Sequence, residues 1–352
     1  MISQKKYRIR KKYLKNLEMD LYRIVWDLTA QVPPGRVTSY GAIAKALGDI
    51  RAARAVGAIE HVNPYAPKVP CHRVVYNDGG IGGFGAPEGV SKKIQLLSSE
   101  GIEVENGKIV DFQDKLFTKF KIREPRPLEQ LREEQQELKK YINVDNGIQL
   151  DQIRTIGGLD ASYNASDGFG AVTIMDFDTL TVLETQTVQV QIRFPYIPTY
   201  LSYHELPVTI SSLNKLKITP DLIIFDGNGV LHPLGMGLAT HAGIILRVPT
   251  MGIAKKLLCG DLQKTKNGQD DVFEVFLDNR IIGYGLKPKS AKNKLVYVSP
   301  GNNIGFKTAL NIAEKICITR QPAPIKIAHE LALEMKKKKK KEKKGVLVKT
   351  RL

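Results

Sequence analysis

One short run of the sequence places a cysteine directly before two basic side chains. Cys71 precedes His72 and Arg73 in the run Val69-Pro70-Cys71-His72-Arg73-Val74. Neighbouring cations favour the thiolate, which is the nucleophilic form of a cysteine. A free cysteine is otherwise a small, inert side chain of a hydrophobic core. The run therefore predicts a reactive thiol at Cys71, with a structural cysteine as the alternative.

Three acidic residues of the second half end or follow expected elements at exposed positions. Asp160 closes an expected strand, Glu205 lies in the run His204-Glu205-Leu206, and Asp226 ends the apolar run Leu222–Phe225. An acid at the end of a strand is a common turn residue. Each of the three alone is therefore read most simply as a turn residue, and a joint role depends on the fold.

Length and charge indicate the domain organisation that must position these residues. The chain has 352 residues, which favours two domains, and its 42% apolar and 25% charged residues are ordinary for a globular protein. The net charge of +17 is not ordinary. Residues 336–352 hold ten Lys and Arg against Glu342 alone, a net +9 that leaves +8 for the rest. We expect this lysine-rich tail to be disordered and to bind phosphates, with solubility as the alternative role.

The cysteines and the apolar runs exclude several classes of protein. Cys71, Cys259 and Cys317 are too widely spaced for a zinc finger, and three cysteines make a disulfide scaffold a poor interpretation. No apolar run approaches a membrane span, and the basic N-terminus lacks the apolar segment of a signal peptide. We expect a soluble, cytoplasmic protein with no membrane partner.

The first half is predicted to contain a helix-turn-helix. Leu21–Leu28 has apolar side chains at helical spacing. Thr38 or Ser39 can cap a helix that ends at Leu47. A further helix over 50–61 is rich in Ala and Gly, which suits tight helix packing and also close approach to a nucleic acid groove.

Residues 17–112 resemble the C-terminal, DNA-binding half of O6-alkylguanine-DNA alkyltransferases. The resemblance rests on five stretches in the same order: Gly35–Tyr40, Ala52–Gly57, Asn63-Pro64, Pro70–Val75 and Leu96–Gly101. It implies an α-rich, winged-helix-like domain, duplex DNA carrying O6-alkylguanine as partner, and alkyl transfer without a cofactor. The family usually has a preceding domain, whereas only a basic stretch of about 16 residues precedes the match here.

The same resemblance implies roles around the thiol. Cys71 would displace the alkyl group from O6 and keep it as a stable thioether, so each molecule would act once. A thiol with a pKa of about 8.5 is weakly ionised at neutral pH and needs a base. His72 would supply that base, Glu100 would orient it and balance its charge, and Asn63 would hold the turn in place.

Two further residues acquire DNA-binding roles from this resemblance. An alkylated guanine is out of reach inside the duplex and must be turned out into a pocket. Arg54 would fill the vacated space in the base stack, and Tyr40 would help to rotate the phosphate and sit beside the flipped base. Without the cysteine run, Arg54 would be read as a surface residue and Tyr40 as a core residue.

The second half begins where the composition changes, at about Leu128. The charged, helical segment Leu128–Leu138 follows Pro125-Arg126-Pro127, which we interpret as part of a linker. Strand patterns follow at Arg154–Ala161, Gly170–Phe177, Thr181–Val190 and Leu222–Phe225. Helix patterns follow at Gly237–Leu246 and Thr308–Ile316. A meander followed by alternating strands and helices predicts an α/β domain with a mixed sheet.

This half, from about Leu128 to Glu334, resembles endonuclease V. The stretches that match are the runs around the three acids together with Phe194–Pro198, His232–Gly237, Thr240–Gly243 and Gly252–Lys256. The resemblance implies a ribonuclease H-like fold in which Asp160, Glu205 and Asp226 meet at a sheet edge. Carboxylates are hard ligands for Mg2+, with Mn2+ as a substitute, and the metal activates water for phosphodiester cleavage.

Four more residues take roles from the second resemblance. Tyr196 would be part of a proline-stiffened wedge that enters DNA near the lesion, where its ring can stack on bases. Lys255 would contact phosphate, and His232 would support the metal or phosphate site. His329 would complete the metal shell, although the preceding segment Arg320–Lys326 is a looser version of the family's.

Together the patterns predict a bifunctional DNA repair protein. Its expected parts are an alkyltransferase-type domain (1–112), a linker (113–127), an endonuclease V-like domain (128–335) and the lysine-rich tail (336–352). The expected reactions are alkyl transfer to Cys71 and Mg2+-dependent nicking 3′ to deoxyinosine. The alternatives are a non-catalytic lesion sensor or a helix-turn-helix regulator, fused to a nuclease that acts on inosine in DNA or in RNA. The cysteine itself argues against the sensor, because alkyltransferase-like sensors replace it.

Overall fold

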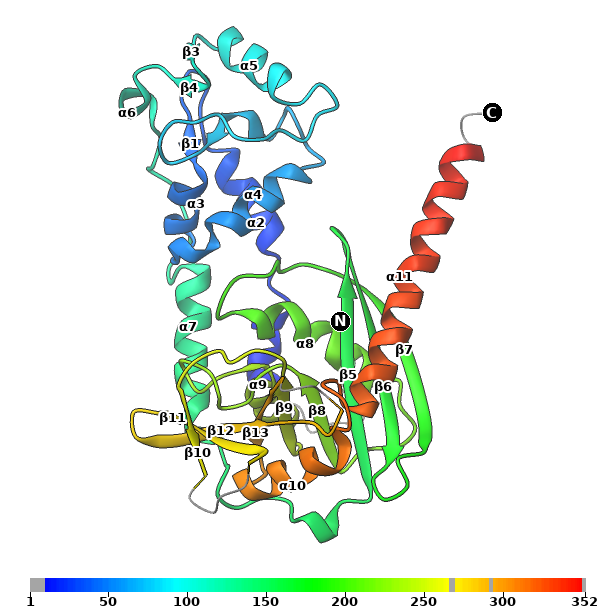
Figure 1. Ribbon diagram of the computed structural model, residues 1–352. Helices are drawn as coiled ribbons and strands as arrows, with labels where there is room; N and C mark the ends of the chain where they lie inside the picture. Colours follow the sequence, from blue (N-terminus) through cyan, green and yellow to red (C-terminus); the bar gives the residue numbers. More distant parts are fainter. Residues whose placement is uncertain (1–9, 266–269, 291–293, 350–352) are drawn as a thin grey trace. The chain divides into compact units, whose positions relative to one another are not determined.

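The computed structural model describes residues 10–265, 270–290 and 294–349, and the chain divides into two compact units (Figure 1). The first, called here the thiol unit, comprises Glu18–Glu134 and Arg193–Tyr200. The second, called the carboxylate unit, comprises Met1–Leu17, Gln135–Ile192 and Leu201–Leu352.

The thiol unit contains the helices expected of a helix-turn-helix. They are α2 (Leu21–Thr29), α3 (Tyr40–Ala46) and α4 (Ala53–His61), with the short 3-10 turn η2 (Ile50–Ala52) before α4. Asp20 caps α2 and Ser39 caps α3, because each side chain accepts a hydrogen bond from a backbone N–H of the first turn. The helix-turn-helix expected from the sequence is therefore present.

The remainder of the thiol unit surrounds a small core of buried aliphatic side chains, which are Val37, Val75, Ile81, Leu97, Ile102 and Ile109. Its elements are β1 (Thr38–Ser39), η3 (Cys71–Arg73), β2 (Val74–Val75), α5 (Val90–Ser99), β3 (Val104–Glu105), β4 (Lys108–Ile109) and α6 (Phe112–Lys115). The segment 113–127, expected to be a linker, packs within this unit. The backbone N–H of Val37 donates to Lys115 O, and that of Phe117 donates to Val37 O. The boundary between the units falls instead within α7 (Pro127–Leu138).

The carboxylate unit is built on a mixed sheet, as expected. The described strands form a nine-stranded sheet in the order β10-β11-β12-β13-β9-β8-β5-β6-β7. Strands β5 (Thr155–Tyr163), β6 (Asp167–Asp176) and β7 (Val182–Gln191) form the antiparallel meander. Strand β8 (Leu222–Asp226) runs parallel to β5, and β9 (Thr250–Ala254) runs parallel to β8. The other strands are β10 (Asp261–Lys264), β11 (Val272–Leu277), β12 (Arg280–Leu286) and β13 (Val296–Asn302).

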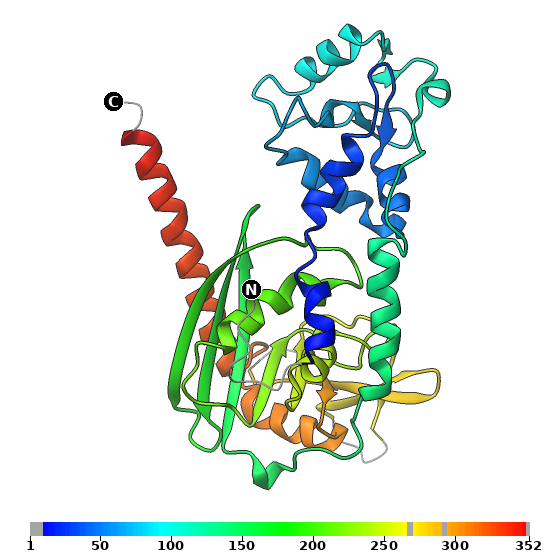
Figure 2. The same cartoon turned by 180° about the vertical axis from the view of Figure 1, so that it is seen from behind.

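Helices cover both faces of this sheet (Figures 1 and 2). They are α8 (Leu201–Leu213), α9 (Leu238–Leu246), α10 (Phe306–Ile316) and α11 (Ala323–Lys349). A Cβ on Gly170 would collide with Val208 of α8, whereas the next residue, Ala171, packs against Ala328 of α11. Successive strand residues point to opposite faces, so α8 and α11 lie on opposite sides of β6.

Two terminal segments differ from the sequence-based expectation. The first described residues form η1 (Lys11–Tyr13) and α1 (Leu14–Leu17), which belong to the carboxylate unit and not to the first domain. The N–H of Arg10 donates to Ile245 O at 2.9 Å. The tail expected to be disordered continues α11 to Lys349, because the helix starts on the sheet and lysine has good helix propensity.

In the described ranges no helix has the length and apolar character required to cross a bilayer.

Candidate active sites

Cys71 lies at a cavity of about 350 Å3 in the thiol unit. Helices α3 and α4 supply one wall and the glycine-rich stretch after β2 supplies another. The side chains that define it include Tyr40, Arg54, Glu60, Cys71, Tyr76 and Phe84. Tyr40 and Tyr76 lie against each other with ring centroids 5.5 Å apart, and Gly57 lies close to the Tyr40 ring. Arg54 is exposed at the cavity on α4.

The Cys71 thiol is buried, and burial raises its pKa. A hydrogen bond with Asn63 opposes this shift. The expectation that His72 and Arg73 would favour the thiolate by proximity is wrong as to net direction, because burial makes the largest contribution to the shift. Both side chains bond to Glu100. Asn63 also stabilises the turn before Cys71, since its Nδ2 donates to Val69 O at 2.9 Å.

His72, Glu100 and Arg73 form a chain of contacts in which His72 is buried and the other two side chains are partly buried. His72 Nε2 is 2.9 Å from Glu100 Oε1, and Arg73 donates to both Glu100 oxygens at 2.8 and 2.6 Å. Burial lowers the pKa of His72 and outweighs the opposing effect of Glu100. Burial alone would raise the pKa of Glu100, but the bonds from Arg73 and His72 lower it. Among the described residues His72 Nδ1 has no hydrogen-bond partner, so this nitrogen remains able to accept a proton.

Two charged residues near Cys71 were not predicted as parts of this site. Glu60 lines the cavity, accepts a hydrogen bond from Thr29 at 2.6 Å, and has a pKa that burial raises to about 7. Lys93 is fully buried, donates to Val74 O at 2.6 Å, and has a pKa that burial lowers to about 8. The sequence signal for their burial is helical spacing. Glu60 follows the buried Val56 by four positions and Lys93 precedes the buried Leu97 by four, so each lies on the buried face of its helix.

In the carboxylate unit, Asp160 and Asp226 lie on neighbouring parallel strands. Strands β5 and β8 pair with Leu159 opposite Phe225, so the two acids follow this pair at the same level of the sheet. Asp160 lies within β5 and does not close it, because the strand continues to Tyr163. Glu205 lies on α8, and all three acids line one narrow cavity.

The three acids are partly buried, so their expected exposure is wrong. Burial, followed by the charges of Asp160 and Asp226, raises the pKa of Glu205 to about 8. Burial also raises the pKa of Asp160, helped by the charge of Asp226 and opposed by a bond with His329. Crowded carboxylates of this kind repel one another unless a cation lies among them.

Two cationic or polar groups contact the acids. Lys255, just after β9, places Nζ 3.0 Å from Asp226 Oδ2, where the resemblance led us to expect a phosphate contact. His329 of α11 places Nδ1 2.6 Å from Asp160 Oδ2. Both residues therefore reach the acids predicted from the sequence.

The donor chemistry fits a hard divalent cation, since three mutually repelling carboxylates surround one cavity. As arranged here, however, no group of three or more His, Cys, Asp or Glu side chains in the described ranges could hold a metal ion. Lys255 supplies positive charge at Asp226 in this arrangement. A cation bound among the acids would compete with the Lys255 ammonium for the Asp226 carboxylate.

Two predicted residues of the second site lie elsewhere. His232 does not line the acid cavity; its Nδ1 accepts a hydrogen bond from the N–H of Leu234 within a turn. Tyr196 belongs to the thiol unit and is 59% exposed. Tyr163 was not predicted from the sequence; burial and the charges of Glu205 and Asp160 raise its pKa far above its usual value.

Comparison with protein families identifies both halves. The Endonuclease V family model matches residues 136–330, and the model of the 6-O-methylguanine DNA methyltransferase DNA binding domain matches residues 20–102. A bifunctional methyltransferase/endonuclease of Picrophilus torridus is 35% identical over 91% of this chain and 98% of its own length. The corresponding protein of Thermoplasma volcanium is 32% identical over 89% of both chains.

Solved structures resemble the carboxylate unit. Endonuclease V of Bacillus subtilis is 28% identical with a TM-score of 0.56, over 63% of this chain and 95% of its own. Endonuclease V of Ciona intestinalis, solved with DNA that contains an inosine, is 25% identical with a TM-score of 0.54. That alignment covers 60% of this chain and 98% of the other.

Proposed function

The chain belongs to the family of bifunctional methyltransferase/endonucleases, and from this premise we propose that it repairs two different lesions of duplex DNA. Membership gives it alkyl-transfer and endonuclease V activities. The lesions that we assign are O6-alkylguanine for the thiol unit and deoxyinosine for the carboxylate unit.

In the alkyl transfer, Cys71 is the acceptor. Its sulfur attacks the alkyl carbon, the S–C bond forms as the C–O6 bond breaks, and the electron pair stays on guanine O6. His72 accepts the thiol proton at Nδ1, and the proton passes to the guanine, so that no external reactant is needed. Because the product is a thioether, each protein molecule reacts once.

The base reaches Cys71 only outside the duplex. The cavity beside the thiol would receive it, with Tyr40 at the cavity wall. Arg54, exposed on α4 at the same cavity, would occupy the space that the base leaves. Asn63 would keep the thiol directed into the cavity through its turn contact with Val69.

In the nuclease reaction, Asp160, Glu205 and Asp226 would hold Mg2+, or Mn2+ as a substitute. When bound, the metal activates water and balances charge on the leaving oxygen. His329, expected from the resemblance to complete the metal shell, would act through its contact with Asp160 and fix the direction of that carboxylate. Lys255, once released from Asp226, would contact the phosphate. Tyr196 would stack on bases beside the inosine, and the nick would lie one nucleotide beyond the inosine on its 3′ side.

The observation that carries this proposal is the presence of both assembled groups in one chain: Cys71 at a cavity with its His72–Glu100 contact, and three acids at another. Matched duplexes with O6-methylguanine or deoxyinosine, with and without Mg2+, test it. We expect a metal-independent adduct on Cys71 from the first and a metal-dependent nick in the second. Inosine-containing RNA, tested in parallel, distinguishes the alternative in which the nuclease acts on RNA. Absence of an adduct from any alkylated duplex would favour the sensor alternative.

A further inference from the structure

A segment from the middle of the nuclease sequence belongs structurally to the thiol unit. Arg193–Tyr200 lies between β7 and α8, which are both in the carboxylate unit, yet it clusters with Glu18–Glu134. Tyr196, the residue to which the proposed function gives the contact with DNA bases, lies in this segment.

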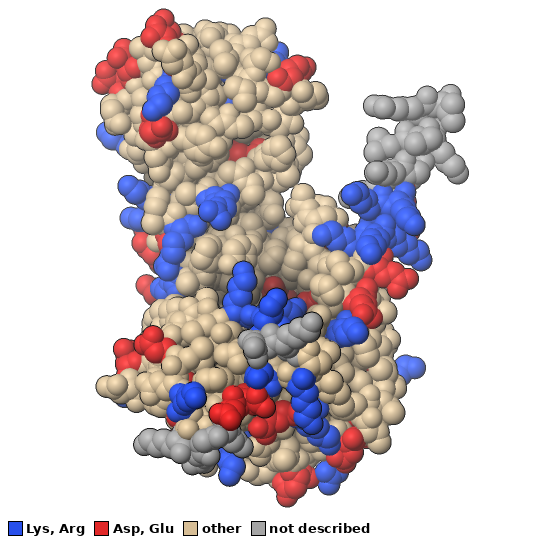
Figure 3. All heavy atoms as spheres, in the orientation of Figure 1, with Lys and Arg blue, Asp and Glu red and all other residues tan. Residues whose placement is uncertain are grey.

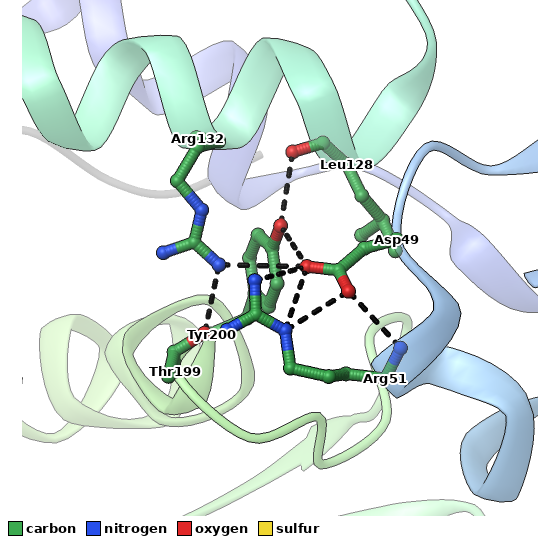
Figure 4. A network of polar contacts seen from close by, with 6 residues as sticks. All are labelled: Asp49, Arg51, Leu128, Arg132, Thr199 and Tyr200. Atoms are coloured by element: carbon green, nitrogen blue, oxygen red, sulfur yellow. Dashed lines mark hydrogen bonds and ion pairs between the residues drawn. The ribbon is translucent and has the colours of Figure 1, made fainter. Parts of the chain in front are cut away.

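The C-terminal end of the segment is fixed by Asp49 (Figure 4). The Tyr200 hydroxyl donates to Asp49 Oδ2 at 2.9 Å, and Leu128 O is 3.3 Å away. Arg132 places its guanidinium 4.4 Å from the centre of the Tyr200 ring and donates to Thr199 Oγ1 at 2.8 Å. Tyr200 is 1% exposed. The buried Tyr200 hydroxyl is therefore bonded within a polar network of the thiol unit.

Asp49 is a permanent anion in this network. Arg51 donates to both of its oxygens at 2.7 to 3.0 Å, and Arg132 Nη2 lies 3.5 Å from Oδ2. Burial would raise the pKa of Asp49, but hydrogen bonds from Arg51 and Tyr200 lower it to about 2. Hydrogen bonds to a charged group are stronger than those between neutral groups.

The other end of the segment is also held, while its centre is exposed. The N–H of Leu21, at the start of α2, donates to Arg193 O at 2.8 Å. Phe194 and Ile197 are buried at 2% and 0% exposure, whereas Tyr196 is 59% exposed. An exposed aromatic ring between two anchored ends has a defined position before it meets a partner, which lowers the entropy cost of binding.

We propose that Asp49 is a positioning residue of the endonuclease reaction, because it holds, through Tyr200, the segment that presents Tyr196 to DNA. The proposal rests on the proposed function, in which Tyr196 contacts bases beside the inosine. It assigns part of the nuclease's lesion recognition to the unit that carries the alkyl acceptor.

The test uses the full chain and two variants of the anchor. Tyr200→Phe removes only the hydroxyl and keeps the ring beside Arg132, and Asp49→Asn removes the charge. Gln31→Ala is the matched control, since Gln31 makes two hydrogen bonds to Lys121 in the same unit without touching the segment. Tyr196→Ala reports loss of the aromatic ring itself.

Three readouts separate positioning from general stability. They are KM and kcat for nicking of an inosine duplex, the fluorescence of a 2-aminopurine beside the inosine without added metal, and alkyl transfer to Cys71. Tyr200→Phe and Asp49→Asn should raise KM about threefold to tenfold with little change in kcat, because the segment spends less time in its binding position. Both should weaken the 2-aminopurine signal, whereas Gln31→Ala should not. Alkyl transfer by Tyr200→Phe should equal that of the wild type.

Other results would overturn either the positioning role of Asp49 or the base contact of Tyr196. Wild-type KM and fluorescence in Tyr200→Phe would overturn the positioning role alone. A parallel loss of alkyl transfer and nicking in Tyr200→Phe would also overturn it, because a general loss of fold would then explain the effect. If Tyr196→Ala binds and nicks like the wild type, the base contact of the proposed function fails, and this proposal fails with it.

Discussion

His329 of α11 and Asp160 of β5 are 169 positions apart in the sequence, yet their Nδ1 and Oδ2 atoms lie 2.6 Å apart. A partner of this kind fixes the direction of a ligand, and its loss typically costs about 10-fold to 100-fold in activity. We therefore expect His329→Ala to slow inosine nicking by that factor and Asp160→Ala to abolish it. Single-turnover nicking at saturating DNA measures both, with Lys326→Ala, an exposed change on the same helix, as control. Wild-type rates in His329→Ala would contradict a role for this contact.

Arg54 should matter for duplex substrates only. It is exposed at the mouth of the Cys71 cavity, where it can replace an extruded base in the stack. Arg54→Ala should slow alkyl transfer from duplex DNA by about tenfold or more and leave transfer from free O6-benzylguanine nearly unchanged. Rates of adduct formation by mass spectrometry measure this. An equal slowing for both substrates would indicate damage to the cavity instead.

Glu60 should make the thiol unit less stable as the pH rises. Its pKa is raised by burial from 4.5 to about 7, so its stabilising neutral form is fully present below about pH 4.5 and lost as the pH passes 7. Thr29, Lys93, Cys71 and Tyr40 are the polar groups that face it, and Lys93, with a pKa of about 8, titrates at the upper end of the tested range in both proteins. The stability of Glu60→Gln relative to the wild type should therefore increase from pH 5 to pH 8, by on the order of 3 kcal/mol at most. Calorimetry at the two pH values measures the gain, and an equal difference at both would contradict it.

The lysine-rich end of α11 should contribute to DNA affinity and not to chemistry. Basic side chains gather on this part of the helix (Figure 3). Removing residues 336–352 takes away a net charge of +9. Truncation should weaken binding mainly at low salt and make the dependence of affinity on salt shallower, because fewer counterions are released. Replacing Lys336–Lys341 with glutamine should also weaken binding and make its salt dependence shallower, while the helix is kept. An unchanged salt slope would leave only a solubility role.

Much of the fold could be predicted because its signals are local. The spacing of Leu21–Leu28 and the cap at Ser39 depend on neighbours in the sequence, and the structure contains α2 and α3 there. The meander β5–β7 likewise follows from apolar and β-branched runs. The helical tail was not predicted because its helix begins in a segment that packs on the sheet, where Ile325 and Ala328 are buried.

The parts that could not be predicted depend on distant contacts. The segment around Tyr196 was assigned to the nuclease by sequence order, whereas its membership of the thiol unit depends on Asp49 and Tyr200, 151 positions apart. The direction in which the pKa of Cys71 is shifted was also not predicted. Adjacent His72 and Arg73 predict a lowered pKa, but their actual bonds to Glu100 and the burial of the thiol are properties of the folded chain.

The central claim is that one chain carries two separable repair chemistries, and a crossed experiment tests it most directly. One duplex containing O6-methylguanine and deoxyinosine is incubated in Mg2+ with the wild type, Cys71→Ser and Asp226→Ala, and both the Cys71 adduct and the nick are measured. The wild type should give one adduct per protein and a nick that leaves hypoxanthine in the strand. Cys71→Ser should give the nick without the adduct, and Asp226→Ala the adduct without the nick. Loss of both activities in either variant, nicking that survives Asp226→Ala, or release of free hypoxanthine would contradict the account.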